Sequence, residues 1–167
     1  LNTFTHAAPV TGQVKLQITG MSGYCEYGKN IDLWSYAYST AAHTESWNFL
    51  STTGSTSGTN TWLCRDSLGV ASWDLTIQSS ILTGTFGQTI PAANVKIYNN
   101  PATVTYGTCA VNAVNNTAGT AIATMTPMFW KSGNQGQVCT VTTTGVKLSV
   151  TIPANQAVGL YTGILTI

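Results

Sequence analysis

Val146–Ile167, VKLSVTIPANQAVGLYTGILTI, is the stretch that decides the fold. Apolar and polar side chains alternate through its first half, which predicts a half-buried strand. Pro153 ends this strand, because proline has no N–H for a sheet ladder. After Gly159 a second strand follows, with Tyr161, Leu165 and Ile167 on one face. We therefore expect two strands joined by one loop, a C-terminal hairpin.

Segments of the same kind recur along the whole chain. They are short, rich in threonine and apolar residues, and separated by Gly, Pro and Asn, whereas the helix formers Glu, Lys and Arg are scarce. Their spacing predicts about ten short strands in an all-β, antiparallel β-sandwich of the Ig-like or pilin-like type. We expect residues 12–167 to form one domain and residues 1–11 to form an N-terminal extension. The polar segment Ser51–Asn60 reads as a flexible hairpin tip.

Charge is unusually low for a soluble protein. Only 7% of the 167 residues are charged and the net charge is +1. Scattered lysines and arginines do not form the basic cluster that nucleic acid requires, so we expect no nucleic-acid partner. No apolar run is long enough to span a membrane. A surface of Thr, Ser and Asn favours a secreted protein, or a subunit packed among copies of itself.

Four cysteines, Cys25, Cys64, Cys109 and Cys139, are present without a C-x-x-C pair, so a zinc site is not indicated. We therefore expect the four cysteines to form two disulfides. Three pairings are possible, and we favour the sequential one, Cys25–Cys64 and Cys109–Cys139. Disulfides indicate export to an oxidising compartment. The chain begins at Leu1, and we expect that a leader was removed.

No catalytic or metal-binding pattern stands out. The five carboxylates are spread along the chain, and we expect them to be turn and edge residues that keep the sheet soluble. We expect His43 to be an exposed loop residue. These carboxylates are Glu26, Asp32, Glu45, Asp66 and Asp74. We therefore expect a protein that is not an enzyme and holds neither a metal nor another cofactor.

Aromatic residues are concentrated in the first half of the chain. Trp34, Tyr36 and Tyr38 alternate along one predicted strand and so share one sheet face. If exposed, this row would form a stacking platform for sugar rings. If buried, it would fill the sandwich core or a subunit contact, which is the commoner place for large aromatics.

Two segments resemble a known family. Trp73-Asp74-Leu75 in ASWDLTIQSSILTG, followed by TIPAANV, resembles the first W-x-L motif of WxL-type bacterial cell-surface domains. The closing VTIPANQAVGLYTGILTI resembles their C-terminal hairpin, but no second W-x-L follows. The resemblance implies that Trp73 and Leu75 are core or motif positions. The first half also resembles secreted pilin and spore-coat-U-type β-sandwich subunits, which assemble by lending an N-terminal strand to the next copy.

These observations predict a structural subunit of an extracellular filament, pilus or surface coat. Leu1–Val10 would add a strand to a neighbouring copy, with Phe4, Ala8 and Val10 on the contacting face. The alternative is a cell-surface module that binds cell-wall or other polysaccharide through Trp34, Tyr36 and Tyr38.

Overall fold

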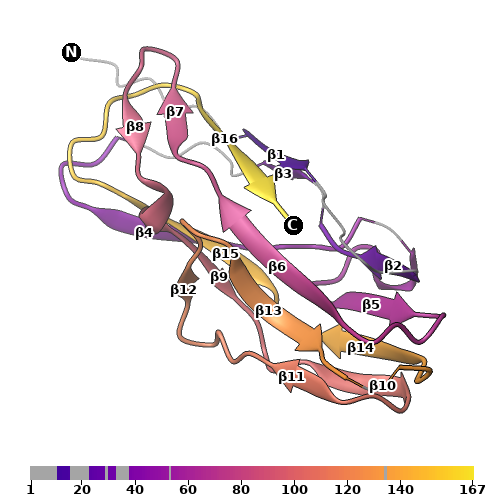
Figure 1. Cartoon of the computed structure of the whole chain (residues 1–167). Coiled ribbons are helices and arrows are strands. Elements are labelled where there is room, and N and C mark those ends of the chain that lie inside the picture. Colours follow the sequence, from indigo (N-terminus) through magenta and orange to yellow (C-terminus); the bar gives the residue numbers. More distant parts are fainter. Residues whose placement is uncertain (1–10, 16–22, 29, 33–37, 53, 134) are drawn as a thin grey trace.

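The computed structural model describes residues 11–15, 23–28, 30–32, 38–52, 54–133 and 135–167. The chain is nearly all-β (Figure 1). Its strands, in chain order, are β1 (Thr11–Lys15), β2 (Gly23–Glu26), β3 (Asn30–Asp32), β4 (His43–Asn48), β5 (Trp62–Asp66), β6 (Trp73–Ser79), β7 (Leu82–Gly84), β8 (Thr89–Ile90), β9 (Val95–Tyr98), β10 (Thr103–Gly107), β11 (Val111–Ala113), β12 (Thr120–Ala121), β13 (Thr126–Lys131), β14 (Cys139–Thr143), β15 (Lys147–Ile152) and β16 (Tyr161–Thr166). Two 3-10 turns, η1 (Gly54–Thr56) and η2 (Ala92–Asn94), interrupt them.

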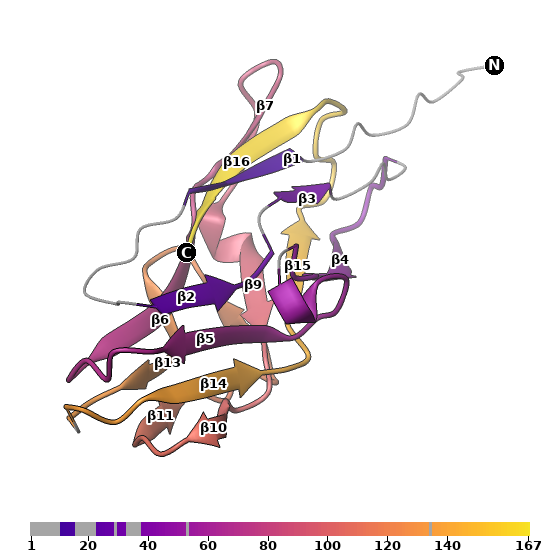
Figure 2. The same cartoon turned by 90° about the vertical axis from the view of Figure 1, so that its right-hand side faces the viewer.

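The described strands form three sheets. The largest runs β11-β13-β6-β16-β1-β3, with β7 paired to β16 and β8 paired to β7. The other two run β10-β14-β5-β2 and β12-β9-β15-β4. Short connections lead from β9 into β10 and from β14 into β15, so these two sheets follow one another along the second layer (Figure 1). Figure 2 shows β2, β5 and β14 in front of β6 and β13, which confirms a sandwich-like arrangement.

Two details of the fold differ from the prediction. The described residues form more strands than expected, because strands of two or three residues, such as β7, β8 and β12, are too short to show a period of two in the sequence. The sheets are antiparallel except at one pair, where β1 lies parallel to β16. A parallel pair cannot be made by a tight turn, and β1 and β16 indeed come from opposite ends of the described chain.

The predicted C-terminal hairpin is wrong. β15 pairs with β4 and β9, whereas β16 pairs with β1, β6 and β7 in the other layer. The segment 153–160 therefore crosses between layers instead of turning back along one sheet. Both strands do bury an apolar face, including Leu148 and Val150 in β15 and Tyr161 and Leu165 in β16. The alternation of apolar and polar side chains shows which face of a strand is buried, but it does not show which strand lies next to it.

Aromatic side chains organise the core between the layers. Trp62 packs edge-to-face on Phe49, with ring centroids 4.7 Å apart, and donates its indole N–H to the Phe49 carbonyl. Trp73 packs edge-to-face on Phe129 at 5.8 Å. Trp73 is 3% exposed and Leu75 is 5% exposed, so both are core positions.

His43 was predicted to lie in an exposed loop, but it begins a strand. Residues His43–Asn48 are strand β4, which pairs with β15 along its whole length. Exposed and half-buried side chains alternate along β4. The sequence signal was weak because β4 carries Thr, Ser, Glu and Asn rather than aliphatic residues.

Candidate binding face on the β10-β14-β5-β2 sheet

A row of side chains crosses the outer face of this sheet, one from each strand. The strand register pairs Tyr24 with Arg65, Arg65 with Thr140, and Thr140 with Tyr106. Tyr24 is 46% exposed and Tyr106 is 71% exposed, while Arg65 is also exposed. Directly opposed residues point to the same side of a sheet. The row therefore presents two phenol rings and one guanidinium to solvent.

The register shifts between Val104 and Tyr106, where a bulge adds one residue to β10. The Thr105 hydroxyl lies 3.0 Å from the Thr142 hydroxyl, while Tyr106 lies opposite Thr140. Thr142 and Thr140 share a face of β14, so the bulge turns both Thr105 and Tyr106 outward. Bulges commonly re-aim a side chain in this way.

β10 is the edge of its sheet. It pairs with β14, and among the described strands none pairs with its other side. All five of its residues are exposed, including Val104 at 36%. An edge strand presents unpaired backbone N–H and C=O groups to any extended chain that approaches it.

At one end of the sheet, Ser55 and Thr56 of η1 enclose the carboxylate of Glu26. Glu26 is 3% exposed and accepts hydrogen bonds from the Thr56 backbone N–H, the Thr56 hydroxyl and the Ser55 hydroxyl. Burial raises the pKa of Glu26, but these hydrogen bonds outweigh it and hold the pKa below its usual value. Ser51–Asn60 was predicted to be a hairpin tip, but the strands that it connects, β4 and β5, lie in different sheets.

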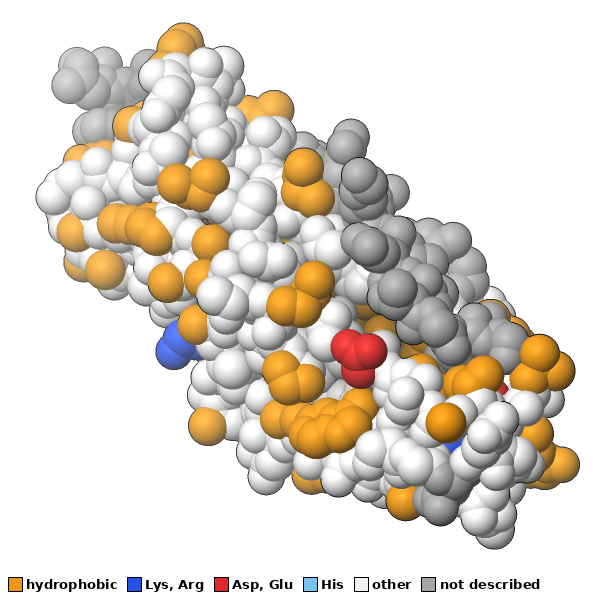
Figure 3. Space-filling model, viewed as in Figure 1, with side chains coloured by type: hydrophobic (Ala, Val, Ile, Leu, Met, Phe, Trp, Pro, Cys, Tyr) orange, Lys and Arg blue, Asp and Glu red, His pale blue; other side chains and the backbone are white. Residues whose placement is uncertain are grey.

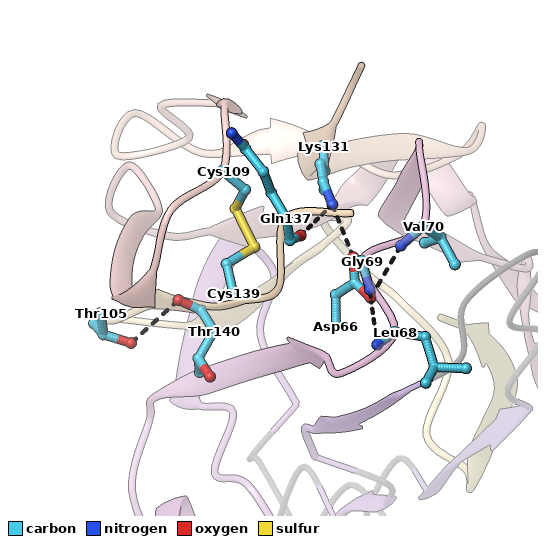
Figure 4. Close-up of a disulfide and its surroundings, with 10 residues drawn as sticks. All are labelled: Asp66, Leu68, Gly69, Val70, Thr105, Cys109, Lys131, Gln137, Cys139 and Thr140. Carbon is cyan, nitrogen blue, oxygen red and sulfur yellow. Dashed lines mark hydrogen bonds and ion pairs between the residues drawn. A yellow bond between two sulfur atoms is a disulfide. The ribbon is translucent and has the colours of Figure 1, made fainter. Parts of the chain in front are cut away.

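A buried ion pair anchors the other end. Lys131 of β13 lies with its Nζ 2.9 Å from Asp66 Oδ2, and both side chains are fully buried (Figure 4). The second oxygen of Asp66 accepts backbone N–H groups from Leu68, Gly69 and Val70. Burial raises the pKa of Asp66, but the lysine and the backbone donors outweigh it and lower the pKa. The pair joins the two layers of the sandwich.

Two disulfides hold the same region, in the sequential pairing that the sequence favoured. Cys25–Cys64 joins β2 to β5, and Cys109–Cys139 joins the segment after β10 to the start of β14. Figure 4 shows the second bond beside the Asp66–Lys131 pair. The strands that carry the exposed row are thus covalently tied on both sides.

The residues predicted for assembly and sugar stacking fall mostly outside the described chain. Phe4, Ala8 and Val10 lie outside it, as do Trp34 and Tyr36, so their roles stay predictions. Tyr38 is described; it is 39% exposed and donates its hydroxyl to the side-chain oxygen of Asn155.

Two of the carboxylates have specific partners in the folded chain. Glu26 and Asp66 are buried and fully engaged, so the expectation that they keep the surface soluble is wrong for these two. His43 Nε2 lies 4.0 Å from Glu45 Oε1 on β4. Within the described residues, no group of three His, Cys, Asp or Glu side chains could hold a metal ion.

Sequence reasoning missed the row Tyr24–Arg65–Thr140–Tyr106, because its members are spread over four strands. A residue's alternation predicts its face only after its strand has been aligned with a neighbour. Comparisons with protein-family models, curated proteins and solved structures found no match. The resemblance to WxL-type domains therefore stays a prediction. No helix in the described part of the chain is long and apolar enough to cross a membrane.

Proposed function

We propose that the chain is a structural subunit of an extracellular filament, pilus or surface coat, assembled by adding a strand from one copy to the β10 edge of the next. The observation that carries the proposal is β10 itself. It pairs with β14 alone among the described strands, and each of its residues is exposed. Main-chain hydrogen bonds along such an edge would supply affinity, and the side chains beside Val104 would set the register.

The placement of the two ends of the contact favours a polymer over a closed pair. The proposed donor segment, Leu1–Val10, leads into β1, which lies beside β16 in one half of the molecule; β10 lies in the other half (Figures 1 and 2). Ten extended residues reach roughly 33 Å, more than the length of a five-residue edge strand. A head-to-tail contact of this kind does not close on itself and propagates as a fibre.

The surface and the cysteines fit an exported subunit. Charged side chains are sparse on the face shown in Figure 3. Both disulfides fit an oxidising environment, as outside the cytosol. Net charge near zero lowers the repulsion between identical copies that pack together.

The first test is negative-stain electron microscopy with size-exclusion chromatography on the full chain and on a variant lacking Leu1–Val10. Because β1 begins at Thr11, the deletion leaves every described strand intact. We expect filaments from the full chain and monomers from the shortened one. A synthetic peptide of Leu1–Val10 should then bind the shortened chain, measured by fluorescence anisotropy.

The acceptor edge has its own test. Val104→Lys should abolish filaments, because a lysine on an edge strand opposes the addition of another strand. Val158→Lys is the matched control, since Val158 is similarly exposed but lies in the segment between β15 and β16. A full chain that stays monomeric, or filaments that survive both the deletion and Val104→Lys, would refute the proposal.

A further inference from the structure

A groove lies on the outer face of the β10-β14-β5-β2 sheet. Its volume is about 410 Å³, within the range of small-molecule sites. Arg65, Ser67, Tyr106, Val138 and Thr140 line it, together with parts of Asp66 and Cys139. Three members of the cross-strand row, Arg65, Thr140 and Tyr106, line this groove, while the fourth, Tyr24, lies opposite Arg65 on β2.

Arg65 is the cation of this groove, and it has no carboxylate partner among the described residues. Asp66, the adjacent acid, forms an ion pair with Lys131 instead. Glu26 lies on the same sheet face, but its carboxylate is enclosed by Ser55 and Thr56. The guanidinium carbon of Arg65 lies 5.4 Å from the centre of the Tyr24 ring. This stacking orients the guanidinium while leaving its N–H groups available to an anion.

Thr140 supplies a second, independent sign of a ligand. It lines the groove between Arg65 and Tyr106, is 5% exposed, and its hydroxyl oxygen has no hydrogen-bond partner. Buried hydroxyl groups are normally paired, and each exception needs an explanation. A polar ligand in the groove would provide one.

We infer that this groove binds a saccharide that carries a carboxylate, such as a uronic acid unit of an acidic polysaccharide. The exposed ring of Tyr106 stacks on the apolar face of the sugar. Arg65 takes the carboxylate through parallel N–H donors, and Thr140 pairs with a ring hydroxyl. A single cation suits one charge per sugar, whereas nucleic acid would need several. The inference does not depend on filament assembly, because these side chains point out of the sheet while strand addition uses its backbone edge.

Isothermal titration calorimetry of the full chain with a galacturonic acid hexamer, at low salt, tests the inference. The neutral galactose hexamer is the comparison ligand. We expect the acidic hexamer to bind at least about tenfold more tightly, since one charge-assisted contact separates the two ligands. Arg65→Gln should remove this difference, and Tyr106→Ser should weaken both ligands.

Lys147→Gln is the matched control. Lys147 also carries its charge over a tyrosine ring, with Nζ 4.4 Å from the centre of Tyr98, but in the β12-β9-β15-β4 sheet. This variant should bind as the unaltered chain does. Absence of binding, equal binding of the two hexamers, or unchanged binding by Arg65→Gln would each overturn the inference. Tighter binding of a sulfated hexasaccharide would overturn the assignment to carboxylates.

Discussion

Replacing Lys131 by methionine removes one partner of the buried pair with Asp66. Methionine keeps most of the volume of the lysine stem, so the core stays filled. What disappears is the ammonium group, which lies 2.9 Å from Asp66 Oδ2 and donates a second hydrogen bond, 2.7 Å long, to the Gln137 carbonyl. The change therefore tests electrostatics rather than packing.

The expected loss of unfolding free energy is about 3–5 kcal/mol, because the carboxylate left behind is fully buried. The backbone N–H donors of Leu68, Gly69 and Val70 remain on the other oxygen, so the lower part of this range is the better expectation. Lys147→Met is the control. Lys147 is half-buried, with its ammonium group over the Tyr98 ring, and losing that contact should cost about 1 kcal/mol or less.

The assay is urea unfolding with both disulfides intact, repeated from pH 7 to pH 3. The lowered pKa of Asp66 means that the pair contributes stability above the unfolded pKa of about 3.9, and that this contribution is lost as pH falls through the folded pKa. The gap between Lys131→Met and the unaltered chain should therefore narrow at low pH. A gap below about 1 kcal/mol at pH 7, or one that widens towards pH 3, would refute the reasoning.

Three further predictions concern Glu26, the glycines in and after η1, and the Cys25–Cys64 disulfide. Glu26→Gln should lower unfolding free energy by about 1–3 kcal/mol and speed hydrogen exchange in residues 51–59, because a charged acceptor is lost; unchanged exchange would contradict it. Gly54→Ala should destabilise more than Gly58→Ala in thermal melts. Both glycines have positive φ, but only at position 54 would the added Cβ clash with the Glu26 carboxylate. Equal losses of thermal stability in the two variants would contradict this explanation. Replacing Cys25 and Cys64 by alanine should cost about 4 kcal/mol in urea unfolding, from a 39-residue separation, and a loss under 1 kcal/mol would contradict the chain-entropy account.

Alternation of apolar and polar residues identified which faces of the C-terminal strands are buried. Tyr161, Leu165 and Ile167 share a buried face as predicted, and Trp73 and Leu75 lie in the core. These assignments succeed because the side-chain direction in a strand repeats every two residues, whatever the neighbour is. The same argument could not pair β15 with β4 or β16 with β1, since partner choice depends on contacts across distant segments.

The residues of the candidate binding face could not be predicted from local sequence either. Neither Tyr24 nor Tyr106 stands out in its own segment, and Arg65 is one basic residue among six. They become a row only when β2, β5, β14 and β10 are placed side by side. The buried carboxylate of Glu26 was equally hidden, because a polar segment from elsewhere in the chain provides its hydrogen bonds.

Composition and local periodicity were thus sufficient for the all-β class, for the presence of disulfides and for the inward faces of several strands, because each depends on residue type or near neighbours. The layer crossing after β15, the parallel β1–β16 pair, the Asp66–Lys131 pair and the groove at Arg65 emerged only from the folded chain. Each of these needs groups far apart in sequence to meet at distances of a few ångströms. No local pattern encodes such a meeting, since it is fixed by the packing of the two layers as a whole.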